Sequence, residues 1–155
     1  MKKEIEYIGK CLLIKAEGER ILIIGDMHVG YGRMSRSYTS AAEVIVSRNL
    51  IEEAIGGLGE ILGRCGGRVD KVVLLGDLKH SFGGITEQEK RDLEIIFDFL
   101  GEQCEEIIII KGNHDNYLLN FAARRKKIAV KDVYAWRDYC FIHGDSDFPE
   151  IYDNR

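Results

Sequence analysis

Three aliphatic runs that each end in a polar turn constrain the fold of this chain more than any other feature of the sequence. The runs are residues 21–24, 72–75 (in a strand expected at 71–75) and 107–110, and the turns after them contain Gly25-Asp26, Gly76-Asp77 and Gly112-Asn113. Because the runs are apolar at consecutive positions, they are typical of central strands that are covered on both faces. We therefore expect them inside a sheet, with a layer on each side.

The segments around these runs predict further strands and several helices. Apolar residues recur at helical spacing over residues 40–62, with three glycines near Gly56 making a break an alternative to one long helix. The capping box Thr86-x-x-Glu89 predicts the start of a second helix. A short helix is expected to run through Phe121. Strands joined by tight turns are expected at 5–8, 11–16 and 20–25, and a later strand at 139–142.

The order of these elements indicates the α/β class. Strands that alternate with amphipathic helices predict a largely parallel sheet, whose ligands gather beyond the carboxyl ends of the strands. A length of 155 residues is that of one domain, so residues 1–155 are expected to form a single domain.

Composition narrows the classes of function. Lys and Arg total 22 against 26 Asp and Glu, so the chain has a weakly negative net charge. Broad nucleic-acid binding would instead call for a strongly basic chain. The four cysteines are far apart and three lie in or beside apolar segments, so we expect reduced, structural thiols. The first residues do not form a signal-peptide core and no apolar run approaches a membrane span, so a cytoplasmic protein with no membrane partner is expected.

The histidines are the candidates for chemistry. All four lie within three residues of an aspartate, in turns that follow predicted strands; they are His28, His80, His114 and His143. Carboxylate, imidazole and amide groups suit divalent metals, and a bridging carboxylate can hold two ions roughly 3.5–4 Å apart. A doubly wound nucleotide-binding domain shares this rhythm of elements, but the chain has no glycine-rich phosphate loop of either common spacing.

Four short motifs carry a resemblance to a known family. Gly25-Asp26-Met27-His28, Gly76-Asp77, Gly112-Asn113-His114-Asp115 and His143-Gly144 resemble, in this order, motifs one to four of the calcineurin-like metallophosphoesterases. Residues 26–31 and 76–80 further resemble archaeal phosphoesterases related to the SbcD nuclease subunit. The resemblance implies an αββα sandwich and an enzyme that hydrolyses phosphomonoesters or phosphodiesters, with a nuclease among the options.

The resemblance also implies roles for individual residues. Asp26 and His28 would bind a first metal, Asp77 would bridge two metals, and Asn113 and His143 would bind the second. The ions would be divalent, with manganese the first expectation and iron, zinc and nickel as alternatives. His114 would act as the general acid or stabilise the transition state.

Four other features have two interpretations each. Asp115 either orients the ring of His114 or caps the helix that follows it. His80 either contacts the substrate phosphate or is an exposed histidine, and Arg33 either contacts the substrate or belongs to a solvated loop. The basic run 124–127 is either a nucleic-acid patch or a cluster that favours a helix end and solubility.

The family's fifth motif, Gly-His-x-His, has no counterpart after His143. Both metal sites would then be one ligand short, the C-terminal strands of the sandwich would be missing, and the sheet would have an exposed edge. A complementing C-terminal chain, a homo-oligomer that completes the sites, and a degenerate domain remain as explanations. The alternative function is accordingly a non-catalytic metal- or phosphate-binding module, or one part of a split enzyme.

Overall fold

The computed structural model describes residues 2–25, 40–76, 78, 85–112, 115 and 117–144, with the backbone alone in 40–48. The helices are α1 (Ser40–Arg64), α2 (Glu87–Gln103) and α3 (Leu118–Ala122). The strands are β1 (Glu4–Ile8), β2 (Cys11–Ala16), β3 (Glu19–Ile24), β4 (Val69–Leu74), β5 (Cys104–Ile110), β6 (Ile128–Lys131), β7 (Tyr134–Trp136) and β8 (Tyr139–Phe141).

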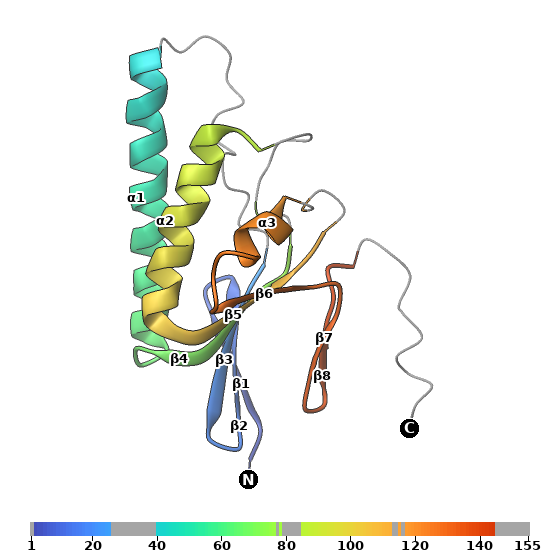
Figure 1. Ribbon diagram of the computed structural model, residues 1–155. Helices are drawn as coiled ribbons and strands as arrows, with labels where there is room; N and C mark the ends of the chain where they lie inside the picture. The colour runs from blue at the N-terminus through green and yellow to red at the C-terminus, as the bar shows by residue number, and fades with distance from the viewer. Residues whose placement is uncertain are drawn as a thin grey trace.

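The main sheet of the described residues has six strands in the order of the sequence, β1-β2-β3-β4-β5-β6. The first three strands form an antiparallel meander, and β3 to β6 are parallel neighbours. Because crossovers between parallel strands are right-handed and the strands advance in one direction, α1, α2 and α3 all lie on one face (Figure 1). Strands β7 and β8 pair antiparallel as a separate hairpin on the other face.

Alternating side chains of the strands supply two cores. The core under the helices takes Leu22 and Ile24 from β3 together with Leu93 and Phe97 from α2. The core under the hairpin takes the intervening strand residues and the hairpin's Trp136 and Phe141, among others. This layering of helices, sheet and second sheet is consistent with the metallophosphoesterase sandwich, and the α/β class is confirmed.

The break considered near Gly56 is absent, because α1 is continuous from Ser40 to Arg64. An apolar stripe of Ile51, Ile55, Leu58 and Leu62 packs against the core, and this tertiary burial outweighs the weak helix propensity of the glycines. The capping box of α2 is confirmed: the Glu89 amide donates to Thr86 Oγ1, and the Thr86 amide donates to the Glu89 carboxylate.

The late strand expected at 139–142 is present as Tyr139–Phe141, and it pairs with β7 and not with the parallel strands. Strands β6 and β7 were not predicted. Among the described residues, β1 and β6 are the outer strands of the main sheet, and Tyr7 of β1 is 81% exposed. The exposed edge expected from missing C-terminal strands stays a prediction. None of the described helices has the length and hydrophobicity that a membrane span needs.

Candidate metal centre

The structure describes two of the nine predicted site residues, Asp115 and His143. The other seven lie outside the described residues: Asp26, His28, Arg33, Asp77, His80, Asn113 and His114. The chain segments that lead directly into most of these residues are described, and their positions define the candidate site. The described residues themselves contain no group of three or more His, Cys, Asp or Glu side chains that could hold a metal.

The ends of three neighbouring parallel strands meet at one edge of the sheet. The amide of Leu75, just beyond β4, donates to the carbonyl of Ile24 at the end of β3, over 3.0 Å. At the next residue, a Cβ added to Gly76 would lie 2.9 Å from the carbonyl oxygen of Ile110 at the end of β5. The segments that lead into the first three motifs therefore begin close together, at the carboxyl ends of β3, β4 and β5.

His143 reaches the same place from the other layer. Its Nδ1 nitrogen lies 2.7 Å from the carbonyl oxygen of Leu75. A backbone carbonyl can only accept a hydrogen bond, so Nδ1 carries the proton and the neutral ring keeps its lone pair on Nε2. Metal-ligating histidines are commonly held this way, with one nitrogen on a carbonyl and the other turned to the metal. The ring of His143 therefore has the tautomer that a ligand needs.

Gly76 is required where these segments meet. Its φ is +81°, a left-handed conformation that side chains other than glycine rarely adopt. A Cβ at this position would lie 2.5 Å from Nδ1 of His143 as well as against the Ile110 carbonyl. The glycine thus forms a cradle for the His143 ring, one residue before Asp77.

Asp115 closes the turn of the third motif. Its side chain is buried, with 1% exposure, and its Oδ2 accepts a hydrogen bond of 3.0 Å from the amide of Gly112. The Asp115 amide donates back to the Gly112 carbonyl, and the Tyr117 hydroxyl lies 3.4 Å from Oδ1. The alternative in which Asp115 caps a helix is wrong, because the N-cap residue of α3 is Tyr117. Its relation to His114 lies outside the described residues.

The basic run 124–127 has structural partners for half of its charges. Arg125 forms an ion pair with Asp98 of α2. Lys127 Nζ donates to the carbonyls of Gly101 and Cys104, over 2.8 and 3.2 Å, at the C-terminal end of α2. Neutralising carbonyls at a helix end is the role that the helix dipole favours for a cation. The structure thus favours the structural interpretation of this run.

A groove of about 780 Å³ lies between α2 and α3. Its charged lining consists of three cations and three carboxylates: Lys90, Arg124, Arg125, Glu87, Glu94 and Asp98. Their formal charges cancel, so this groove lacks the positive potential that attracts a phosphate backbone. Its place beside Tyr117 nevertheless connects it to the third motif through the hydroxyl that approaches Asp115.

The residues fit a divalent metal centre. The sequence places carboxylate, imidazole and amide donors directly after strand ends that the structure brings together, and the described histidine has the tautomer of a ligand. The model of the calcineurin-like phosphoesterase family matches residues 19–154. The chain therefore belongs to the calcineurin-like phosphoesterases, a family that implies divalent metal cofactors.

Other comparisons add less. Among solved structures, the chain is similar to the nuclease MPE of Pseudomonas putida, with 14% sequence identity and a TM-score of 0.44. The match covers 88% of this chain and 63% of the nuclease, so the chain spans less than two thirds of that protein. No curated protein matches the chain.

Proposed function

We propose that this chain hydrolyses phosphomonoester or phosphodiester bonds with two divalent metals at the carboxyl edge of β3, β4 and β5. The observation that carries the proposal is the meeting of His143 with Leu75 and Gly76, one residue before Asp77. That contact joins the second and fourth motifs across two layers of the fold. A histidine held in this way can turn its other ring nitrogen to a metal.

The proposed ligands are those of the family motifs: Asp26 and His28 for one metal, Asp77 between the two, and Asn113 and His143 for the other. When bound, the two cations would supply Lewis acidity toward the phosphate and lower the pKa of water. Manganese is the first ion to test, because the set mixes oxygen and nitrogen donors.

The remaining residues would act on the substrate. His114 would donate a proton to the departing oxygen, and Asp115 would hold the turn that carries it, through the Gly112 amide. Arg33 and His80 would contact the phosphate, since both follow motif residues in the sequence. The resemblance to SbcD-related phosphoesterases makes nucleic acid the first natural substrate to test.

The test is hydrolysis of an aryl phosphodiester and an aryl phosphomonoester by the purified chain, with Mn²⁺ titrated in. Asn113→Ala and Asp77→Ala should each reduce turnover by at least about 100-fold, since even residues that support a ligand cost 10–100-fold when lost. The matched control is Asn120→Ala, the same change at an exposed position of α3, which should keep full turnover. Single-stranded DNA and RNA oligonucleotides extend the assay to a nuclease.

Two results would overturn catalysis. Equal turnover in Asn113→Ala and Asn120→Ala would mean that the activity comes from elsewhere. Mn²⁺ binding, measured by calorimetry, with no hydrolysis of any of the four substrates would favour the binding-module alternative.

A further inference from the structure

The β7–β8 hairpin carries His143 and is attached to the main sheet at its two ends. At one end, two residues beyond β8, the His143 ring bonds to Leu75. At the other end, the hairpin turn meets the turn between β2 and β3, through an ion pair of Arg137 with Glu17. A second ion pair joins Asp138 of the same turn to Lys3. The hairpin thus extends from the carboxyl ends of the parallel strands, where the candidate metal centre lies, to the turn between β2 and β3 at the opposite end of the sheet.

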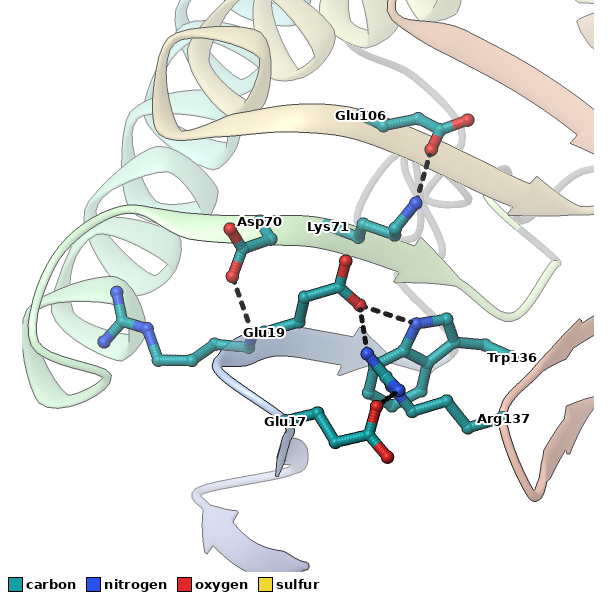
Figure 2. A network of polar contacts seen from close by, with 8 residues as sticks. Glu17, Glu19, Asp70, Lys71, Glu106, Trp136 and Arg137 are labelled. Carbon is teal, nitrogen blue, oxygen red and sulfur yellow. Dashed lines mark hydrogen bonds and ion pairs between the residues drawn. The ribbon is translucent and has the colours of Figure 1, made fainter. Parts of the chain in front are cut away.

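Glu19, the first residue of β3, is the central acceptor of the far attachment. One carboxylate oxygen accepts from Trp136 Nε1 at 3.0 Å and from Arg137 Nη2 at 3.2 Å. The guanidinium carbon of Arg137 also lies 5.0 Å from the centroid of the Trp136 ring. Figure 2 shows the Trp136 and Arg137 side chains converging on Glu19, with Glu17 below them. We call these four residues the hairpin clamp.

The clamp joins two tight turns. Glu17 opens the two-residue turn between β2 and β3 with a φ of +51°, and Arg137 opens the two-residue turn between β7 and β8 with a φ of +55°. Positive φ is the ordinary geometry of such hairpin turns. The ion pair of Arg137 with Glu17 therefore joins one tight turn directly to the other.

Aromatic stacking makes the hairpin rigid between its two ends. The rings of Tyr134 and Phe141 stack with centroids 5.9 Å apart, as do those of Trp136 and Tyr139. Trp136 and Phe141 are also buried against the sheet. A rigid two-stranded unit transmits a shift at its tip to its base, and the base leads directly to His143.

We infer that Glu19 is a positioning residue for the metal centre. Through its bonds to Trp136 and Arg137 it fixes the position of the hairpin on the sheet, and the hairpin in turn holds the His143 ring against Leu75. This inference rests on the proposed function for its consequence, which is metal affinity. Its structural part, the orientation of the His143 ring, stands without metal and can be measured separately.

The variants are Glu19→Ala, which removes the acceptor, and Glu19→Gln, which keeps an oxygen for Trp136. The matched control is Glu106→Ala. Glu106 lies two residues before Ile108 and so on the same face of the sheet, but its partner is Lys71 and not the hairpin (Figure 2). Trp136→Phe keeps an aromatic ring and removes the N–H donor, so it tests the same bond in a second way.

The metal-free measurement is the long-range ¹H–¹⁵N NMR spectrum of the histidine rings at pH 8, with His143→Gln used to assign the His143 signals. The wild-type ring should be the Nδ1–H tautomer. In Glu19→Ala and Trp136→Phe the signals should move toward the tautomer mixture of a freely rotating ring. Glu19→Gln and Glu106→Ala should keep the wild-type pattern.

The second measurement is Mn²⁺ affinity by calorimetry. Glu19→Ala should weaken binding about 10-fold, whereas Glu19→Gln and Glu106→Ala should stay within about two-fold of wild type. An unchanged His143 tautomer in both Glu19→Ala and Trp136→Phe would overturn the inference, as would equal losses in Glu19→Ala and Glu106→Ala. Wild-type protein that binds no Mn²⁺ would instead refute the proposed function, while the NMR result still decides the role of the clamp.

Discussion

The two faces of the main sheet are covered by different means. On one face, α1, α2 and α3 pack aliphatic and aromatic side chains into a core that spans all six strands, from Ile8 to Ile128. On the other face, a hairpin with three-residue strands is attached by two buried aromatic rings and the clamp at Glu19. The first face relies on burial, and the second adds directional bonds.

This difference separates stability from the placement of a ligand. Burial of apolar surface is non-directional, so the helix face can supply free energy without fixing any one side chain. Hydrogen bonds weaken steeply with angle, so the hairpin face can orient a ring but gains little net stability from each bond. His143 follows the hairpin of the second face, and its ring contacts Leu75 just beyond the end of β4 in the shared sheet.

The largest expected effect comes from the same substitution on each face. Phe97→Ala removes a ring that is 2% exposed and packs edge-on against Phe121 of α3, so it should lower the free energy of unfolding by about 3–5 kcal/mol. Phe141→Ala, at 8% exposure on the hairpin, should cost about 2 kcal/mol, because a short hairpin can detach while the rest stays folded. Urea unfolding followed by circular dichroism measures both.

The same pair of variants should show the opposite order in metal binding. Phe141→Ala loosens the strand that leads to His143, so Mn²⁺ affinity should fall more in it than in folded Phe97→Ala. If Phe141→Ala destabilised the fold as much as Phe97→Ala, the two faces would be equivalent in stability and the comparison would fail.

An intermediate effect is expected where the two faces meet, at Gly76. Gly76→Ala places a methyl group against the His143 ring and the Ile110 carbonyl on a left-handed backbone, so it should cost about 2–3 kcal/mol. The control Gly9→Ala has a φ of +60° and open space around the added Cβ, so strain alone should cost it about 1 kcal/mol. Thermal unfolding of both variants checks this, and equal losses would show that the cradle has no steric role.

The sequence predicted the strands that lead into the site because their signal is local. The central parts of β3, β4 and β5 are apolar at consecutive positions, and the turns after them carry glycine and polar residues. The capping box at Thr86 is local in the same sense, since both of its bonds span three residues. Such features need no knowledge of the rest of the chain.

What the sequence missed depends on distant partners. Strands β6 and β7 are short and half-buried, and β6 exists because Ile128 to Lys131 pair with β5. Trp136 and Glu19 are 117 residues apart, so no local pattern shows that they bond. The motif glycine at 76 was visible in the sequence, but its reason, the nearby His143 ring, was not.

The smallest expected effect concerns the cysteines, which divide between the two faces. Cys11, Cys65 and Cys104 are free and buried in the helix-face core, whereas Cys140 on the hairpin is free and exposed. Burial raises the pKa of Cys104 to about 11, and its thiol lies 3.1 Å from the Leu100 carbonyl, to which only the protonated form can donate. Burial likewise raises the pKa of Cys11 and of Cys65.

Native protein at pH 8 should therefore take up one iodoacetamide label, at Cys140. With a pKa of about 11, only about one Cys104 thiol in 1,000 is ionised at that pH, and the thiolate is the reactive form. Because the folded-state pKa lies above the roughly 8.5 of an unfolded cysteine, the stabilisation from the protonated thiol is complete below pH 8.5 and is lost as the pH rises toward 11.

Intact mass should show no label in native Cys140→Ser and four labels in urea-unfolded wild type. A second label on the native chain at pH 8, taken up as fast as the first, would mean that the helix face opens as readily as the hairpin face.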